Sequence, residues 1–252
     1  MGRPDEPLGR SVPIRVHGLG DDVVAICPGL ALRKDGGLMQ WGWAPEGVGD
    51  ELPVGATKVG GEPDLPDGTR WPTDDDDRPL AFVGQIALAD LLAAGVGDLP
   101  AGLLSFFFAF DETMSGGCVL HSSDGVALRR REAPDSLQRS ARLDPVAVDM
   151  EIELTLWPVE SDVVAQLGLS DDEHWAYDEL ADSHEEPIHR VFGHPAIVQD
   201  DPRTAGDVLL LQVDLIDDAL NEYGEGRMYW FIARDDLAEG RFDRVRAEFQ
   251  QT

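Results

Sequence analysis

Two stretches of the chain share the same order of apolar and polar positions. Each has a Gly-Pro turn, an apolar run that carries one glutamine, a short helical stretch, a Gly turn and an aromatic run. This order predicts a strand-helix-strand unit that occurs twice. The turn, the apolar run and the aromatic run cover residues 60–63, 80–88 and 102–109 in the first stretch, and residues 192–195, 208–215 and 226–233 in the second.

The glutamines of the two apolar runs, Gln85 and Gln212, occupy equivalent places. A buried amide without a partner costs about 1–3 kcal/mol, so each must find hydrogen bonds. We expect both side chains to bind neighbouring backbone and to hold the two halves together, with contact to a ligand as the alternative. The helices of the two units are predicted at residues 88–94 and 217–223, and both are short enough to need packing against a sheet.

Further strands are predicted between the two units. Residues 117–129 have the pattern of a hairpin, with Asp124 and Gly125 as a type I′ turn. Residues 146–156 alternate as one half-buried strand with an acidic outer face. Residues 38–43 are expected to form a strand that covers a core edge.

Helical patterns follow at residues 161–167 and 170–181, and Ser170 with Glu173 forms a capping box at the start of the second. The pattern as a whole predicts an α+β fold with antiparallel-rich β-sheets, short packing helices and internal duplication of the strand-helix-strand unit. We divide the chain into a β-rich N-terminal extension at 1–50, a first half at 51–158 and a second half at 159–252, which together form one compact unit.

Charge limits the partners of this protein. The 252 residues include 49 acidic and 20 basic residues, for a formal net charge of −29. Such a chain repels nucleic acids and anionic membranes, so we expect neither as a partner. It suits either simple solubility or a basic protein partner. The basic run at residues 129–131 is expected to be a solvated strand end that is paired with carboxylates.

The sequence predicts a cytoplasmic protein. No apolar run is long enough for a membrane span, and the first residues lack the apolar core of a signal peptide. Cys27 and Cys118 lie far apart among apolar neighbours, which favours reduced, buried thiols over a disulfide.

Several short motifs occur in a fixed order between residues 55 and 250. They are TKVGGEPDLP at 57–66, WP at 71–72, FVGQI at 82–86, LLSFFF at 103–108, HRVFGHP at 189–195, QDD at 199–201 and LLLQV at 209–213. In this combination the chain resembles the YwqG-like family of bacterial proteins, a domain of unknown function. The resemblance implies an α+β fold with internal duplication, and it brings no established reaction. The first fifty residues do not match the family.

Candidate metal and catalytic chemistry is sparse. His184 and His189 are five residues apart with Pro187 between them, so they cannot form the two-histidine zinc motif of a helix. A looser set of His184, His189, His194 and Asp200 or Asp201 is an alternative. We expect instead that His189 and His194 hold the 193–195 turn by hydrogen bonds and that His184 is solvated. No nucleophile elbow, phosphate loop or dinucleotide turn is present. We therefore expect no metal and no cofactor.

Two functions from different classes follow. The first is a non-enzymatic protein-binding module with an acidic surface, such as an immunity or inhibitor protein with a basic partner. The second is a small-molecule or metal-dependent enzyme with a site between the two halves. The residues expected to line that cleft are Gln85, His189, His194, Asp200 and Gln212.

Overall fold

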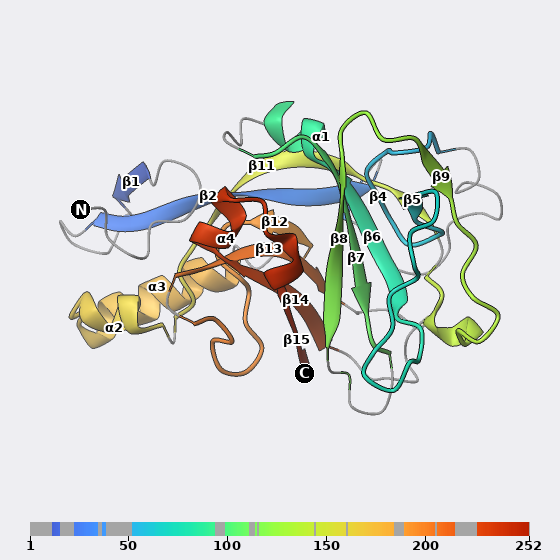
Figure 1. Cartoon of the computed structure of the whole chain (residues 1–252). Helices are drawn as coiled ribbons and strands as arrows, with labels where there is room; N and C mark the ends of the chain where they lie inside the picture. Colours follow the sequence, from blue (N-terminus) through green and yellow to red (C-terminus); the bar gives the residue numbers. More distant parts are fainter. Residues whose placement is uncertain are drawn as a thin grey trace.

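The computed structural model contains two antiparallel sheets that pack face to face, with a small two-stranded sheet beside them (Figure 1). The structure describes residues 12–15, 23–34, 37–38, 52–93, 99–110, 114, 116–143, 145–159, 161–183, 189–204, 206–214 and 226–251. Among these residues, no helix combines the length and apolar character needed to cross a membrane.

The larger sheet has eight strands within the described residues, and every pairing in it is antiparallel. Its main path is β1 (Val12–Arg15), β2 (Val23–Lys34), β12 (Arg190–Phe192), β13 (Asp207–Asp214), β14 (Gly226–Ala233) and β15 (Arg246–Gln251). Strands β3 (Gly37–Leu38) and β11 (Asp149–Thr155) also pair with β2. The N-terminal strands therefore belong to the same sheet as the C-terminal ones.

The smaller sheet has five antiparallel strands among the described residues. Their order is β10 (Val146–Ala147), β4 (Lys58–Val59), β6 (Ala81–Ala87), β7 (Gly102–Phe108) and β8 (Gly117–Ser123). Strands β5 (Asp64–Pro66) and β9 (Leu128–Arg130) pair separately. The helices are α1 (Leu88–Ala93), α2 (Asp162–Gln166), α3 (Asp171–Ser183) and α4 (Arg234–Ala238), with short 3-10 turns η1 (Arg139–Ala141) and η3 (Phe242–Arg244).

The main core lies between the two sheets, because alternate residues of each strand point to the same face. Trp230 of β14 packs edge-on against Phe106 and Phe108 of β7, with ring centroids 5.6 and 5.8 Å apart. The outer faces carry separate clusters, such as that of Phe107 with Trp71. The inward residues of the two central strands are Leu104, Phe106 and Phe108 of β7 and Met228, Trp230 and Ile232 of β14.

Strands β6 and β13 each contain a bulge just before their glutamine. The register of β6 to β7 shifts between Phe82 and Gly84, and that of β13 to β14 shifts between Leu209 and Leu211. Strand β4 pairs with β6 and strand β12 pairs with β13, and at the end of each of these partners two consecutive residues have left-handed backbone. Their φ angles are 68° at Gly60, 72° at Gly61, 58° at Phe192 and 75° at Gly193.

Much of the predicted secondary structure is confirmed. The mixed α+β character, the antiparallel sheets and the short helices are present, and α1, α2 and α3 occupy the predicted helical segments. The capping box also forms: a Glu173 carboxylate oxygen accepts from the backbone N of Ser170 at 2.9 Å. The predicted helix at 217–223 and residues 39–43 of the predicted N-terminal strand lie outside the described residues.

Two strand predictions are wrong. The arms of the hairpin at 117–129 do not pair with each other, because β8 pairs with β7 and β9 pairs with β5. The turn between them is not type I′ either, since Gly125 has positive φ (78°) and Asp124 does not. The single strand predicted at 146–156 is two strands: β10 lies in the smaller sheet and β11 in the larger one.

Candidate functional site

Gln85 lies on the outer face of β6, because its neighbour Ile86 points into the shared core. Its Oε1 accepts from the backbone N of Asp64 at 2.9 Å. Its Nε2 donates to the carbonyl of Ala56 and to the Asp64 carboxylate, both at 2.8 Å. The prediction that Gln85 binds neighbouring backbone is confirmed. These partners all lie in the first predicted half, so they do not link the two halves.

Asp64 is the centre of a buried cluster of charges. Its Oδ2 accepts from Lys58 Nζ at 3.2 Å and from the backbone N of Gly55 at 3.0 Å, and its Oδ1 accepts from Arg130 Nε at 3.2 Å. Lys58 and Asp64 are both almost fully buried. Two cations therefore share one buried carboxylate. Arg130 was expected to be solvated, but only 20% of its side chain is exposed, because Asp64 and the carbonyl of Leu52 hold it inward.

Burial acts on the pKa of both members of the Lys58–Asp64 pair. For Lys58 it is the largest influence and lowers the pKa, against the attraction of Asp64. For Asp64 burial alone would raise the pKa, but hydrogen bonds from Gly55 and Gln85, together with the cations Lys58 and Arg130, bring the pKa below its usual value. Asp64 is therefore a stable carboxylate at neutral pH.

Gln212 has a similar place in the larger sheet. It is opposite Arg190 of β12, as Gln85 is opposite Lys58 of β4. Its Oε1 accepts from the backbone N of Ala196 at 2.9 Å, and the carbonyl of Ala196 accepts from Arg227 at 3.0 Å and from Tyr229 at 2.8 Å. The prediction that Gln212 binds backbone is also confirmed.

His194 lies in the loop after β12 and is almost fully buried. Its backbone N donates to Thr155 Oγ1 at 2.8 Å, its ring stacks on Trp157 with centroids 4.0 Å apart, and its Nδ1 is 3.4 Å from Arg203. Burial, followed by the charges of Arg203 and Arg190, lowers the pKa of His194 well below its ordinary value. His194 is therefore neutral at neutral pH.

The other predicted cleft residues, His189 and Asp200, are held by partners in the second half of the chain. His189 is buried, and its Nδ1 accepts from the backbone N of Asp214 at 3.2 Å. Asp200 is exposed, and its carbonyl, not its carboxylate, is held by Gln250. The neighbouring Asp201 instead pairs with Arg203, the residue that faces His194.

The structure thus brings His189, His194 and Gln212 to the larger sheet and leaves Gln85 on the smaller one. Ligand binding by these residues and Asp200 stays a prediction. His184 lies outside the described residues. Among the described histidines, cysteines and carboxylates, no group of three or more is close enough to hold a metal ion.

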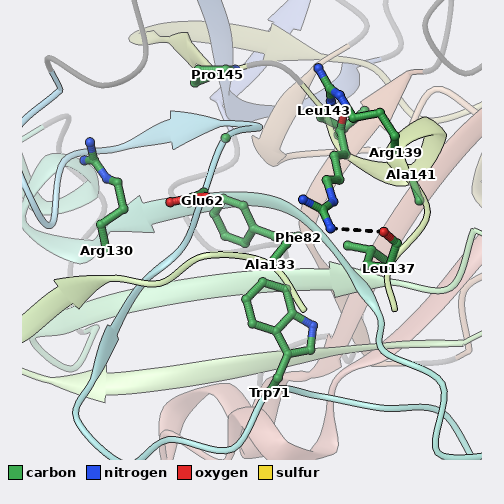
Figure 2. Close-up of a pocket in the computed structure, with 12 residues that line it drawn as sticks. Glu62, Trp71, Phe82, Arg130, Ala133, Leu137, Arg139, Ala141, Leu143 and Pro145 are labelled. Carbon is green, nitrogen blue, oxygen red and sulfur yellow. Dashed lines mark hydrogen bonds between the residues drawn. The ribbon is translucent and has the colours of Figure 1, made fainter. Parts of the chain in front are cut away.

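A cavity of about 250 Å³ opens beside the Asp64 cluster, and Arg130 belongs to both (Figure 2). Apolar and aromatic side chains meet three arginines and one glutamate in its walls. The lining residues are Gly61, Glu62, Trp71, Phe82, Arg130, Ala133, Leu137, Arg139, Ala141, Arg142, Leu143 and Pro145.

Local contacts fix the walls of this cavity. Trp71 donates from Nε1 to the carbonyl of Leu80 at 2.8 Å, which orients its ring. Gly61 lies so close to Pro145 that a Cβ there would be 2.7 Å from the proline Cβ, and its N donates to the carbonyl of Leu143 at 2.8 Å. A glycine with positive φ is what allows the 143–145 segment to pass this close.

Sequence reasoning missed this cavity. The only signal was that five of the arginines, an unusually dense group for so acidic a chain, fall within residues 129–142. Trp71 and Phe82 were visible only as apolar residues of the first half. The return of the 130–145 segment over the smaller sheet, which brings these groups together, has no local sequence signal.

Comparison with known families places the chain. Residues 57–250 match the family model described as Domain of unknown function (DUF1963). The chain belongs to this family. No curated protein matches the chain.

The DUF1963 region runs from Thr57, next to β4, to Gln250 in β15, so it contains Gln85, Gln212 and the arginine-lined cavity. It leaves β1, β2 and β3 outside, although β2 pairs with β11 and β12 of the DUF1963 region. It also contains α3, which Figure 1 shows on the side of the molecule away from β6, β7 and β8.

Helix α3 presents one apolar residue to solvent. Tyr177 anchors the helix: it is fully buried, packs with Leu156 and Val164, and donates to the carbonyl of Trp157 at 2.7 Å. Trp175, two residues earlier, points to the opposite side of the helix. It is 63% exposed, the highest value among the large hydrophobic residues that the structure describes as exposed.

Carboxylates surround Trp175 on the same face of α3, three and four residues away in each direction. All of them are exposed, and none forms an ion pair with a described residue. We call this surface the Trp175 face. Its members are Trp175, Asp171, Asp172, Asp178 and Glu179.

Proposed function

We propose that this DUF1963 protein is a non-enzymatic protein-binding module that recognises a basic protein partner through the Trp175 face. The observation that carries the proposal is a tryptophan with 63% exposure inside a group of four unpaired carboxylates. Tryptophan is among the residues most enriched as interface anchors.

The surroundings of Trp175 specify the chemistry of the partner. A rim of four carboxylates attracts lysine and arginine side chains and repels acidic surfaces, while the indole ring offers both apolar area and a face for a cation. The net charge of −29 adds long-range attraction for a basic protein. We therefore expect the partner to carry an apolar contact surrounded by basic residues.

Trp175→Ala tests the proposal. We expect a basic protein to be captured from native host lysate by the wild type and lost with Trp175→Ala, with at least a tenfold weaker affinity once the partner is purified, because anchor tryptophans contribute about 2 kcal/mol or more. The control is Val126→Ala, which removes another exposed apolar side chain, 46% exposed, from a distant loop. Equal binding of Trp175→Ala and wild type would contradict the proposal, as would capture of no basic protein.

The rim carboxylates are tested by association kinetics. Replacing all four with their amides should slow association and flatten its salt dependence. A charge-matched control replaces four other exposed carboxylates, Asp75, Asp124, Glu132 and Asp135, and should have a smaller effect. Equal slowing by both sets would mean that net charge alone, and not the Trp175 face, guides the partner. If the partner is an enzyme, loss of its activity in the complex would assign an immunity or inhibitor role.

We also propose that the family region arose by duplication of a strand-helix-strand unit, with halves at 51–158 and 159–252 after an extension at 1–50. The support is the equivalent strand order, with β4-β6-β7-β8 in one sheet and β12-β13-β14-β15 in the other, the shared bulges and the shared left-handed pairs. Common ancestry predicts that the first half of one family member resembles the second half of another in sequence. Absence of such similarity across the family would argue for convergence.

We place the protein in the cytoplasm. Supporting this, the Cys118 thiol is free and half-buried, and burial raises its pKa to about 11, so it is a poor nucleophile for disulfide formation. Cell fractionation tests the location directly.

A further inference from the structure

We propose that the arginine-lined cavity binds a small organic carboxylate with a flat apolar body. This site lies on the outer face of the smaller sheet and is independent of the Trp175 face. The cavity of about 250 Å³ is suited to a small ligand.

The charge of the lining points to an anion. Among the described residues that line this cavity are three arginines, Arg130, Arg139 and Arg142, and one carboxylate, Glu62. Arg130 is already paired with Asp64, so Arg139 and Arg142 are the cations left to compare with Glu62, whereas the chain as a whole has more than two acidic residues for each basic one. The lining of this cavity is therefore rich in guanidinium groups, although the protein as a whole is strongly negative. Since arginine recognises carboxylates with two parallel hydrogen bonds, an anion in this cavity would balance the positive charge of the lining.

Arg142 is the arginine best placed to hold the ligand. Its terminal nitrogen donates to the carbonyls of Pro134 at 2.9 Å and Leu137 at 3.1 Å, so the guanidinium is fixed in position. Its Nε is buried without an acceptor, and it forms no ion pair within the described part of the chain. A fixed, half-buried cation without an ion pair is costly unless an anion approaches the exposed part of its guanidinium.

The other walls define the body of the ligand. The rings of Trp71 and Phe82 and the side chains of Leu137 and Leu143 provide apolar surface, as Figure 2 shows for the two rings. Trp71 is held in place by its bond to Leu80 and by edge contact with Phe107, with centroids 5.5 Å apart. A flat hydrocarbon group fits such walls. Glu62 in the lining disfavours a doubly charged phosphate and so favours a single carboxylate.

The test uses phenylacetate as the probe and phenylacetamide as its neutral counterpart, with binding to the full chain measured by ligand-observed NMR and calorimetry. We expect phenylacetate to bind the wild type saturably and at least tenfold more tightly than phenylacetamide. Arg142→Gln should weaken phenylacetate at least tenfold. Ala133→Phe, which fills the cavity and keeps every arginine, should abolish binding.

Two controls separate the site from general effects. Arg129→Gln removes an arginine that is 72% exposed on the same strand as Arg130, and should leave the affinity within twofold of the wild type. Trp175→Ala should also leave it unchanged, so that failure of this site and failure of the proposed function are distinguishable. Thermal unfolding confirms that each variant is folded, and Arg142→Lys, which keeps the charge, replaces Arg142→Gln if the latter does not fold. Equal affinity for the two probes, full affinity of the Arg142 variant, or no saturable binding of phenylacetate would each overturn the proposal.

Discussion

His194 is a buried polar residue that is fixed by contacts from several parts of the chain. Its ring lies against the indole ring of Trp157 and next to Arg203, and its backbone N is bound by Thr155. Protonation of the ring would place a third positive charge beside Arg203 and Arg190 inside the protein. The folded state therefore resists a proton that the unfolded chain accepts below pH 6.5, the ordinary pKa of histidine.

This resistance predicts a pH-dependent contribution to stability. Because the folded pKa is lowered, the stabilisation is present above about pH 6.5 and is lost as the pH falls from there toward the folded pKa, by up to about 1.4 kcal/mol per pH unit. The free energy of unfolding of the wild type minus that of His194→Gln should therefore shrink between pH 7 and pH 5 in urea titrations. Protonation of carboxylates at low pH also changes the stability of this acidic protein, but it affects wild type and variant alike. Subtracting the two free energies of unfolding therefore removes this effect. His174→Gln, at an exposed site on α3, should show a constant difference. A constant difference for His194→Gln as well would contradict the argument.

For single residues, the sequence predicted which buried side chains require hydrogen bonds better than it predicted which groups supply those bonds. An apolar run around Gln85 or Gln212 shows that the amide must be satisfied, and both do bind backbone. The same reasoning could not identify the Asp64 cluster. The Asp64 carboxylate binds Lys58, which is 6 residues away in the sequence, and also Arg130, which is 66 residues away. Long-range partners of this kind depend on the path of the chain, and the cavity beside Asp64 was missed for the same reason.

For the strands, local sequence signals predicted where a strand lies along the chain, but they did not always predict the strand with which it pairs. The turn at Asp124 and Gly125 forms, but β8 and β9 leave it for different sheets. The sequence alternates at 146–156, yet the chain changes sheets between Ala147 and Asp149. Alternation reports which side chains share a face, whereas pairing depends on which edge is available in the folded molecule.

Gly117 marks a place where β8 closely approaches β15 of the other sheet. A Cβ there would lie 2.5 Å from the carbonyl of Phe107 and 2.9 Å from the Cβ of Ala247 on β15. Gly117→Ala should therefore push β8 away from β15 and lower the free energy of unfolding by about 1–3 kcal/mol in urea titrations. Ser123→Ala, at the exposed end of the same strand, should change it by less than about 0.5 kcal/mol. Unchanged stability of Gly117→Ala would mean that the sheets have room to separate there.

For the whole molecule, the shared core makes the two sheets dependent on each other. Neither sheet can bury its inner face alone, because Phe106 and Phe108 of one sheet pack on Trp230 of the other. Strands β6 and β13 share a bulge before their glutamine, but the apolar surface that stabilises each sheet is supplied by the other sheet. We therefore expect one cooperative unit instead of two domains that fold separately.

Phe106→Leu tests this cooperativity, since it alters the inner face of the smaller sheet and leaves every hydrogen bond of the larger sheet in place. We expect a loss of roughly 1–3 kcal/mol, and we expect it to appear equally in the slowest-exchanging amides of β6 and β7 and in those of β13 and β14. Native-state hydrogen exchange measures both sets in one experiment, with Val126→Ala as a control that should change neither. If protection fell in β6 and β7 alone, the sheets would be separate folding units, and the contacts of Trp230 would join two domains instead of forming one core. Equal loss in both sheets would mean that the smaller sheet, with its arginine-lined cavity, and the larger sheet gain or lose their structure together.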